Sequence, residues 1–267
     1  MRYYYEDKWV KIIHGDCREI LPALDVKVDL VVTSPPYNMR TRIRNGEYTE
    51  REWSGHFSKK YSEFRDAFPI DEYYEIHKMV LSHLLRLASI VFVDIQVVTG
   101  SKEAWFKIIG DFNRQLKDIV IWDKGEGQPA MHDSVINRSS ELIMIFEATS
   151  TAGRAFTKSY FGRGTMPDIW RIGRGGNGKI EGHAALFPDE LVDKVLVGWS
   201  LPNDLILDPF LGSGTTCYCA KKLNRYSIGI EIEEKYCEIA ARRVQQSVFE
   251  FGEQSEKQGT GIQSELL

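Results

Sequence analysis

The segment DLILDPFLGSGTT, residues 204–216, is the most informative motif of this 267-residue chain. An apolar run at 204–208 leads into a turn with glycines at 212 and 214, and a helical pattern follows. Glycines in such a turn let the backbone tighten and let its N–H groups approach a ligand closely. Glu231 ends the next apolar run, 19 residues after Gly212, where nucleotide-binding α/β folds place an acid that binds ribose hydroxyls. The third glycine of the dinucleotide fingerprint is missing, which disfavours a nicotinamide or flavin enzyme.

Short apolar runs rich in Val and Ile alternate with helical patterns along the rest of the chain. Most of these runs are continuous, as expected for strands that are buried on both faces of a parallel sheet. The predicted strands are 10–14, 28–33, 89–95, 118–122, 141–146, 204–208 and 226–232. The predicted helices between them are 71–88, 101–116, 189–198, 213–224 and 233–246. This alternation predicts a three-layer α/β fold with a mostly parallel, seven-stranded sheet.

Length and composition favour one large domain. With 43% hydrophobic residues the chain can bury a single sizeable core, which we expect within 1–248, and the polar, acidic residues 249–267 predict a disordered tail. No stretch approaches the about 20 apolar residues of a membrane helix, and the N-terminus lacks a signal-peptide core, so we expect a cytoplasmic protein. The four cysteines lack metal-ligand spacing, which predicts reduced thiols and no metal.

The second informative motif is DLVVTSPPYN, residues 29–38, in which an apolar strand ends directly in Ser34, Pro35, Pro36 and Tyr37. Two consecutive prolines fix φ and remove two backbone donors while keeping carbonyl acceptors. This arrangement suits a site that accepts hydrogens from an amine. An isolated P-P-Y is usually a proline-rich strand terminator with a surface tyrosine. Its position after an apolar strand, in a chain that also holds the glycine-rich turn, favours catalysis.

Two segments carry local positive charge although the net charge of the chain is −4. Residues 39–60 and residues 147–182 each have a net charge of about +3, and the second segment is rich in glycine. A surface that binds nucleic acid would therefore be local. As isolated charge runs, both segments are also compatible with solvated loops.

DPFLGSGTT, followed by IGIEIEEKY, resembles the S-adenosylmethionine-binding signature of DNA amino-methyltransferases. The resemblance implies that the loop from Asp208 to Gly214 wraps the methionine end, that Glu231 holds the ribose, and that Thr215 and Thr216 lie near the carboxylate. The segment HAALFP, 183–188, resembles a second cofactor-contacting element of the family. The cofactor-binding candidates are Asp16, His183, Asp208, Pro209, Phe210, Gly212, Gly214, Thr215 and Glu231. Asp16 also fits the N-cap of the helix that follows it.

The T-S-P-P-Y-N motif precedes the cofactor motif by about 175 residues, with a glycine-rich basic insert between them. This order resembles the permuted β-group of the same family over residues 10–246, which implies a circularly permuted Rossmann-like fold with target recognition at 147–182. The resemblance implies that Ser34 and the Pro35 carbonyl accept both N–H bonds of an exocyclic base amine, with Tyr37 stacked on the flipped base. The DNA-binding candidates are Arg40, Arg42, Arg44, Arg163, Arg171 and Arg174.

The resemblance implies double-stranded DNA as substrate, and it allows a cognate restriction endonuclease and a homodimer as partners. A serine first in S-P-P-Y resembles the N4-cytosine enzymes, while adenine N6 is the alternative amine. Cytosine C5 methylation is disfavoured because no cysteine follows a proline. The alternative hypotheses for the function are a nicotinamide or flavin oxidoreductase, a methyltransferase of RNA or protein, and a non-enzymatic DNA-binding subunit. The oxidoreductase would leave the segment 34–37 without a role, and the permuted motif order argues against the RNA or protein methyltransferase. Intact motifs in both halves of the chain argue against the non-enzymatic subunit.

Overall fold

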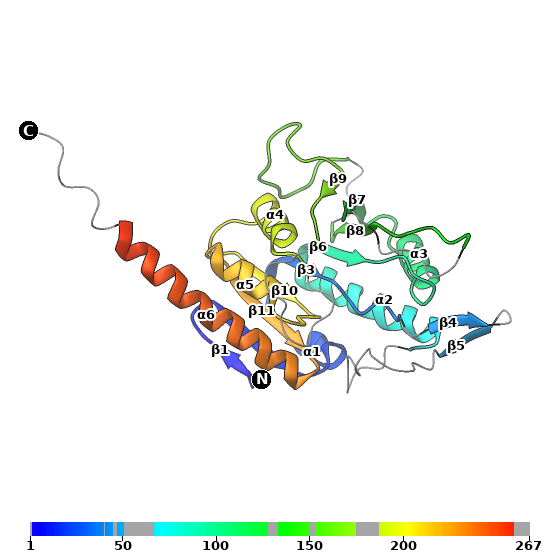
Figure 1. Ribbon diagram of the computed structural model, residues 1–267, viewed down its shortest axis with the longest axis horizontal. Coiled ribbons are helices and arrows are strands. Elements are labelled where there is room, and N and C mark those ends of the chain that lie inside the picture. Colours follow the sequence, from blue (N-terminus) through cyan, green and yellow to red (C-terminus); the bar gives the residue numbers. More distant parts are fainter. Residues whose placement is uncertain are drawn as a thin grey trace, which may run out of the picture.

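The computed structural model describes residues 2–39, 41–44, 47–50, 67–125, 127, 133–149, 153–174 and 187–258. Side chains are not described for 41–44, 47–50 and 247–258. The centre of the described chain is a nine-stranded sheet in the order β1-β2-β11-β10-β3-β6-β8-β7-β9, and helices lie on both of its faces (Figure 1). A separate two-stranded sheet consists of β4 and β5.

The element bounds are as follows. The strands are β1 Tyr5–Glu6, β2 Val10–His14, β3 Val28–Thr33, β4 Thr41–Arg44, β5 Glu47–Glu50, β6 Ala88–Ile95, β7 Leu116–Asp123, β8 Ser140–Glu147, β9 Ile169–Arg171, β10 Leu205–Asp208 and β11 Tyr226–Glu231. The helices are α1 Cys17–Ala23, α2 Ile70–Leu87, α3 Lys102–Asp111, α4 Asp189–Trp199, α5 Thr215–Lys222 and α6 Glu234–Gln258.

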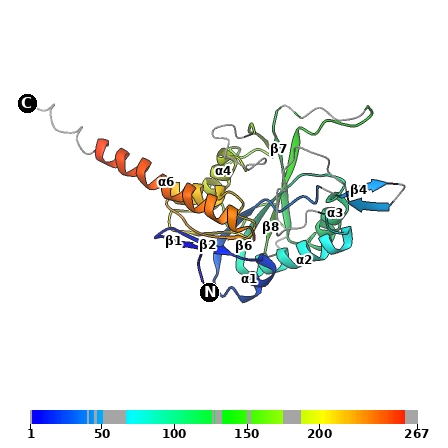
Figure 2. The same cartoon turned by 60° about the horizontal axis from the view of Figure 1, so that its bottom comes forward.

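Two helical layers bury the two faces of the sheet. Helices α1, α2 and α3 pack on one face, where Leu21, Leu84 and Ile108 join Val31 and Val91 in the core. Helices α4, α5 and α6 cover the other face (Figure 2). The central strands are apolar on both faces because both faces are covered, which explains why their sequences do not alternate.

The predicted fold class is confirmed, with corrections at the edges. All seven predicted strands are present, but the sheet has nine strands. The additional strands β1 and β9 have two and three residues, too short to give an apolar run. Strands β2, β11, β10, β3 and β6 are parallel, whereas β8 is antiparallel to both β6 and β7.

The C-terminal helix also differs from expectation. Helix α6 continues through Gln258, although the sequence predicted a disordered tail from residue 249. Residues 259–267 lie outside the described part of the chain. No helix within the described residues combines the length and apolar character needed to cross a membrane.

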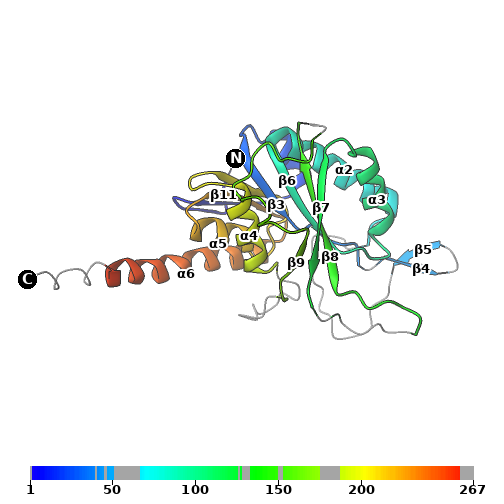
Figure 3. The ribbon, with the colours of Figure 1, turned by 90° about the horizontal axis from the view of Figure 1, so that it is seen from above.

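The topology brings the two predicted motifs together. Strands β3 and β10 are parallel neighbours, with Ile206 beside Leu30 and Leu207 beside Val31. Their carboxyl ends therefore lie at the same edge of the sheet. Figure 3 shows the sheet from above, between α2 and α3 on one side and α4, α5 and α6 on the other. The turn after β3, residues 34–38, is called the catalytic turn below, and the turn after β10, residues 209–214, is called the cofactor turn.

Candidate active site

One buried carboxylate joins the end of β3, directly before the catalytic turn, to the cofactor turn. The Thr33 hydroxyl donates a hydrogen bond of 2.7 Å to Asp208 Oδ1, and the Thr216 hydroxyl donates one of 2.7 Å to Oδ2. The Phe210 backbone N–H also donates to Oδ1, at 3.1 Å. Burial raises the pKa of Asp208 to about 6. Asp208, a predicted cofactor residue, therefore fixes the end of β3 against the start of the cofactor turn.

Helices α2 and α3 hold the backbone of the catalytic turn. The Tyr73 hydroxyl donates a 2.6 Å hydrogen bond to the Pro36 carbonyl. The Trp105 indole N–H donates to the same hydroxyl at 3.2 Å. Because proline fixes φ and these aromatic side chains are buried, the turn is rigid on the side that faces the core.

Asn38 closes the catalytic turn in the left-handed backbone region, with φ of 56°. Asparagine adopts this conformation more readily than most residues because its short side chain bonds nearby backbone groups. Here the buried amide donates to the carbonyls of Phe68 and Gly100, each at 2.9 Å, and its oxygen accepts from the Phe68 N–H at 2.7 Å. The last residue of S-P-P-Y-N therefore anchors the turn to two other segments.

The polar side of the catalytic turn joins a buried acidic cluster. Ser34 Oγ lies 2.8 Å from the Tyr37 hydroxyl oxygen and 3.4 Å from Asp94 Oδ2. The Tyr37 hydroxyl lies 3.0 Å from Asp94 Oδ2 and 2.9 Å from Glu141 Oε2. Lys124 Nζ pairs with the other Glu141 oxygen at 2.6 Å. The two predicted catalytic hydroxyls are therefore connected to three ionisable side chains in the interior.

Burial and charge shift the ionisation of this cluster. The pKa of Asp94 is raised well above its ordinary value by burial and by the nearby charge of Glu141. The pKa of Tyr37 is raised by burial and by the same two carboxyl groups. Glu141 has a cation at contact distance, whereas Asp94 Oδ1 has no hydrogen-bond partner among the described residues. The arrangement thus favours a neutral Asp94, while Glu141 is paired with Lys124.

Asp94, Glu141 and Lys124 were not among the residues predicted from the sequence. The available signal was an acid inside the apolar run SIVFVDI and another at the start of ELIMIF. Carboxylates are rarely buried without a partner, so an acid in a buried strand marks either a partnered core group or a site. The antiparallel pairing of β6 with β8 is what brings the two acids together.

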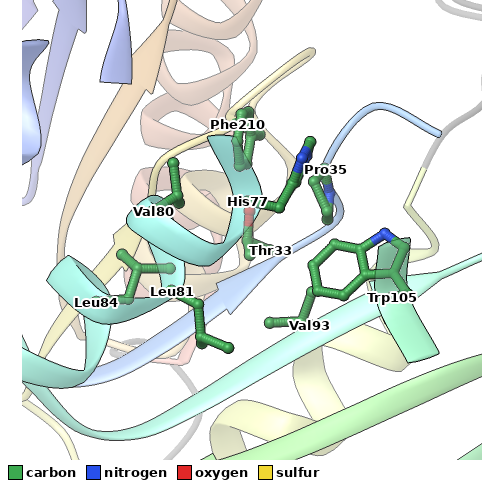
Figure 4. A pocket seen from close by; sticks show the side chains of 9 residues that line it. All are labelled: Thr33, Pro35, His77, Val80, Leu81, Leu84, Val93, Trp105 and Phe210. Carbon is green, nitrogen blue, oxygen red and sulfur yellow. The ribbon is translucent and has the colours of Figure 1, made fainter. Parts of the chain in front are cut away.

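A cavity lies beneath the catalytic turn, where side chains from both turns and from α2 and α3 converge (Figure 4). His77 contributes its ring to this cavity and bonds through Nδ1 to the Tyr73 carbonyl at 2.8 Å. The ring stacks on Phe210 of the cofactor turn, with centroids 5.9 Å apart. Burial lowers the pKa of His77 to about 4, so the ring is neutral at physiological pH. The lining residues are Thr33, Pro35, His77, Val80, Leu81, Leu84, Val93, Trp105 and Phe210.

The cofactor turn depends on its glycines. Gly212 and Gly214 adopt φ of 54° and 85°, in the left-handed region that disfavours larger residues. A Cβ at Gly214 would lie 2.7 Å from Ala240 Cβ and 2.9 Å from Ala240 Cα, which is closer than real contacts. The turn thus packs directly against α6, and the close approach of its backbone to a ligand stays a prediction.

Glu231 lies at the end of β11, beside the cofactor turn. Its Oε2 accepts the Gly212 N–H at 2.7 Å, and Oε1 accepts the Glu233 N–H at 2.9 Å. Burial raises the pKa of Glu231 to about 7. A carboxylate has about four acceptor positions, so these two bonds leave capacity for two ribose hydroxyls. The glycine turn and this carboxylate fit the nucleoside and methionine parts of S-adenosylmethionine.

The remaining predicted cofactor residues fall in different places. Asp16 caps α1 and accepts the Arg18 N–H at 2.8 Å, so the N-cap interpretation is confirmed. Asp16 follows β2, whose last residue His14 is paired with Glu231, so it lies at the same sheet edge. Thr215 accepts a 2.8 Å hydrogen bond from Arg243. Pro209 lies in the cofactor turn, and His183 lies outside the described residues.

The predicted DNA-binding arginines are only partly described. Arg163, Arg171 and Arg174 are exposed on the segment 153–174, called the insert below. The side chain of Arg171 is 78% exposed. Arg171 is the last residue of β9, where it is paired with Asp123 of β7. Arg40 lies outside the described residues, as do the side chains of Arg42 and Arg44 on β4.

Comparisons with known proteins give consistent matches. A family model for N6/N4 methyltransferases, described as DNA methylase, matches residues 28–242. The type II methyltransferase M.HinfI of Haemophilus influenzae is 27% identical over 256 residues, covering 88% of this chain and 68% of that protein. M.ScaI of Streptomyces caespitosus is 27% identical over 282 residues, covering 92% and 86%.

Solved structures share the fold. The PvuII DNA methyltransferase, described as cytosine-N4-specific, superposes with a TM-score of 0.68 at 19% identity, covering 91% of this chain and 88% of that one. The M1.HpyAVI complex with S-adenosylmethionine superposes with a TM-score of 0.60 at 20% identity, covering 88% and 98%.

Proposed function

The chain belongs to the N6/N4 DNA methylase family, and from this premise we propose that it methylates N4 of cytosine in double-stranded DNA. Its coarser activity is that of the family, a DNA amino-methyltransferase that uses S-adenosylmethionine. The observation that carries the proposal is the Thr33–Asp208 hydrogen bond, which holds the catalytic turn beside the cofactor turn. The two motifs that the reaction needs are thereby fixed at one sheet edge.

The catalytic turn would activate the amine by accepting its hydrogens. The exocyclic nitrogen is a poor nucleophile because its lone pair is delocalised into the ring. When Ser34 Oγ and the Pro35 carbonyl accept its two N–H bonds, the nitrogen moves toward sp³ geometry and its lone pair becomes available. The Pro36 carbonyl is already engaged by Tyr73, so it orients the turn.

The base must leave the duplex before its amine can reach this turn. Tyr37 lies next to Ser34 in the turn, and its hydroxyl end is fastened in the acidic cluster. Its ring would stack on the flipped base, a contact worth about 1–3 kcal/mol. A fastened ring loses little conformational entropy when the base arrives.

The cofactor turn would hold the methyl donor against this amine. S-adenosylmethionine supplies an electrophilic methyl group on its sulfonium. Glu231 would accept hydrogen bonds from the ribose hydroxyls, while Gly212 and Gly214 allow close approach of the backbone. Because Asp208 joins the end of β3 to the cofactor turn, it would hold the bound donor beside the amine, and such positioning supplies much of the acceleration in enzymes.

Cytosine N4 is preferred because serine begins the S-P-P-Y motif. A serine there resembles the N4-cytosine enzymes, whereas the N6-adenine enzymes more often carry aspartate. Adenine N6 remains the alternative, since the same acceptors serve either amine.

The insert is proposed to contact the DNA. Thr157 anchors it to the sheet by donating from its backbone N–H and its hydroxyl to Glu147 Oε1, at 2.8 and 2.9 Å. Phe161 packs on Trp199 with ring centroids 4.8 Å apart. This anchored segment presents its arginines to solvent, where contact with phosphates makes DNA affinity strongly salt-dependent.

Nucleoside mass spectrometry tests the proposal. The protein is incubated with mixed-sequence duplex DNA and isotopically labelled S-adenosylmethionine, and the DNA is digested to nucleosides. We expect labelled N4-methylcytosine. Labelled N6-methyladenine would overturn the choice of base, and label in RNA but not in duplex DNA would overturn the substrate class.

A further inference from the structure

Three polar side chains form a path that begins at the proposed amine site and runs into the protein. Ser34 Oγ contacts the Tyr37 hydroxyl at 2.8 Å, and that hydroxyl contacts Glu141 Oε2 at 2.9 Å. The path ends at Glu141, whose Oε1 accepts a hydrogen bond from Lys124 Nζ at 2.6 Å. Glu141 and Lys124 are 8% and 7% exposed, so the far end of the path is shielded from bulk water.

The direction of these hydrogen bonds follows from counting protons. A tyrosine hydroxyl has one proton, yet the Tyr37 hydroxyl faces carboxyl oxygens of both Asp94 and Glu141. Two carboxylates this close in a buried site do not both ionise, and the Lys124 cation stabilises the charge on Glu141. Asp94 then holds a proton of its own. Tyr37 therefore donates to Glu141.

The same direction makes Ser34 a hydrogen-bond acceptor toward the substrate. Once the Tyr37 proton points to Glu141, the Tyr37 oxygen accepts the proton of Ser34. The lone pairs of Ser34 Oγ then face the amine. An acceptor is what the proposed activation of the amine requires at this position.

We propose that Ser34, Tyr37 and Glu141 carry the proton of the amine away from the reacting nitrogen, and that Lys124 keeps Glu141 an anionic acceptor. This inference rests on the proposed function, because it assigns the destination of the proton that amine methylation releases. Ser34 is the group that touches the substrate. Tyr37, Glu141 and Lys124 act through it.

The step balances in atoms and charge. The nitrogen lone pair forms the new carbon–nitrogen bond as the carbon–sulfur bond breaks, and the electron pair of that bond stays on sulfur. The positive charge, now on nitrogen, leaves as a proton taken by Ser34 Oγ. Ser34 passes its own proton to the Tyr37 oxygen, and Tyr37 passes its proton to Glu141 Oε2. The charges of the methylated nitrogen and of Glu141 are thereby neutralised.

Neutral hydroxyls suit this transfer. Burial and the two carboxyl groups raise the pKa of Tyr37, so Tyr37 receives one proton as it gives up another and does not ionise. Positioned general bases typically contribute about 10²–10⁴-fold to a rate. Loss of the proton path should therefore lower the rate of methyl transfer without changing the affinity for the cofactor.

Single-turnover methyl transfer at saturating duplex DNA and S-adenosylmethionine, followed from pH 5.5 to 9, tests the path. We expect Glu141→Gln to lower the rate about 100-fold or more without changing cofactor affinity. We expect Tyr37→Phe, which keeps the stacking ring, to lower it similarly. The double variant should lose no more than the slower single variant, since both break one path.

Lys124→Met gives a readout that a purely structural role would not. Without the cation, the charge on Glu141 loses its buried partner, so the acid limb of the pH–rate profile should move to higher pH, with activity regained in alkaline buffer. The matched control is Lys117→Met, in strand β7, which ends one residue before Lys124. Lys117 pairs with Glu147 at 3.1 Å and is as buried as Lys124. That control should lose stability but keep the wild-type profile.

The outcomes separate the two proposals. Absence of methyl transfer to DNA amines by the wild type would overturn the proposed function itself. An active wild type, together with a Glu141→Gln variant of unchanged rate and pH profile, would overturn the proton path alone. Additive losses in the double variant would also overturn it. If Glu141→Gln does not fold, Tyr37→Phe and Lys124→Met decide by the same criteria.

Discussion

The catalytic turn and the cofactor turn follow neighbouring parallel strands, yet different forces hold them. Prolines and side-chain hydrogen bonds from α2, β6 and β8 fix the catalytic turn. Glycines in the left-handed region fix the cofactor turn, together with the Glu231 carboxylate, which accepts the Gly212 backbone N–H. Single side chains in the catalytic turn should therefore control the rate, whereas substitutions in the cofactor turn should change stability and cofactor binding.

Ser34→Ala should have the largest effect of the variants that test this comparison. Removal of the hydroxyl deletes one acceptor for the amine and the entrance to the acidic cluster. We expect turnover to fall about 10²–10³-fold, the usual cost of deleting one group that stabilises the reacting centre. Cofactor affinity, measured by calorimetry, should stay near that of the wild type.

The matched control is Ser200→Ala. Ser200 is a buried serine after α4 that bonds the Leu196 carbonyl, away from both turns. It should leave turnover unchanged. Undiminished turnover in Ser34→Ala would show that the amine is activated elsewhere, and the contrast between the turns would fail.

Gly214→Ala sharpens the contrast from the other side. The added Cβ would meet the backbone of α6 at Ala240 in a left-handed conformation that costs alanine energy. We expect a loss of about 2–3 kcal/mol in the free energy of unfolding, measured by urea denaturation. Gly110→Ala in α3 is the control, because its Cβ meets open space and alanine favours a helix. A neutral Gly214→Ala would mean that the turn can shift.

Glu231→Ala should weaken S-adenosylmethionine binding about 10- to 100-fold, the value of hydrogen bonds to a charged group, while leaving the rate at saturation closer to normal. Glu234→Ala, exposed in the first turn of α6, is the control. Calorimetric titration measures the affinity. An unchanged affinity in Glu231→Ala would assign the ribose contact to another residue.

The same residue predicts a pH dependence. The pKa of Glu231 in the folded protein is about 7, raised from 4.5, so the folded state binds the proton more tightly than the unfolded chain. The carboxyl therefore contributes stability that is complete below about pH 4.5 and is lost as pH rises through 7. Thermal unfolding of the ligand-free protein between pH 5 and 8 should show this loss in the wild type but not in Glu231→Ala.

The sequence predicts much of this architecture, because apolar runs and helical spacings mark every long element of the sheet. The turns are predictable too, since glycine in 212–214 and proline in 35–36 impose local conformation. Strands β1 and β9 are too short to leave a pattern. Asp94 and Glu141 are far apart in sequence, and only the β6–β8 pairing makes them neighbours. His77 follows the apolar spacing of α2, so nothing distinguishes it from an ordinary core residue.

At neutral pH, His77→Leu should change the free energy of unfolding least of these variants. Its effect on stability should appear at acidic pH, whereas that of Glu231→Ala appears as the pH rises. The pKa of His77 in the folded protein is about 4, lowered from 6.5 by burial beneath the catalytic turn. The neutral ring therefore contributes stability that is present above about pH 6.5 and is lost as pH falls through 4. Among the described residues its Nε2 has no hydrogen-bond partner, so an apolar replacement loses no hydrogen bond at this atom.

We therefore expect wild type and His77→Leu to unfold at similar temperatures at pH 7.5, with the variant gaining relative stability as the pH falls from 6.5 toward 4. This dependence is opposite in sign to that of Glu231. Stability near the catalytic turn thus falls in acid, where His77 must stay neutral in the folded protein. Stability near the cofactor turn falls as the pH rises, where Glu231 must ionise. Parallel pH curves for wild type and variant would show that His77 titrates alike in folded and unfolded chains, and this part of the contrast would be lost.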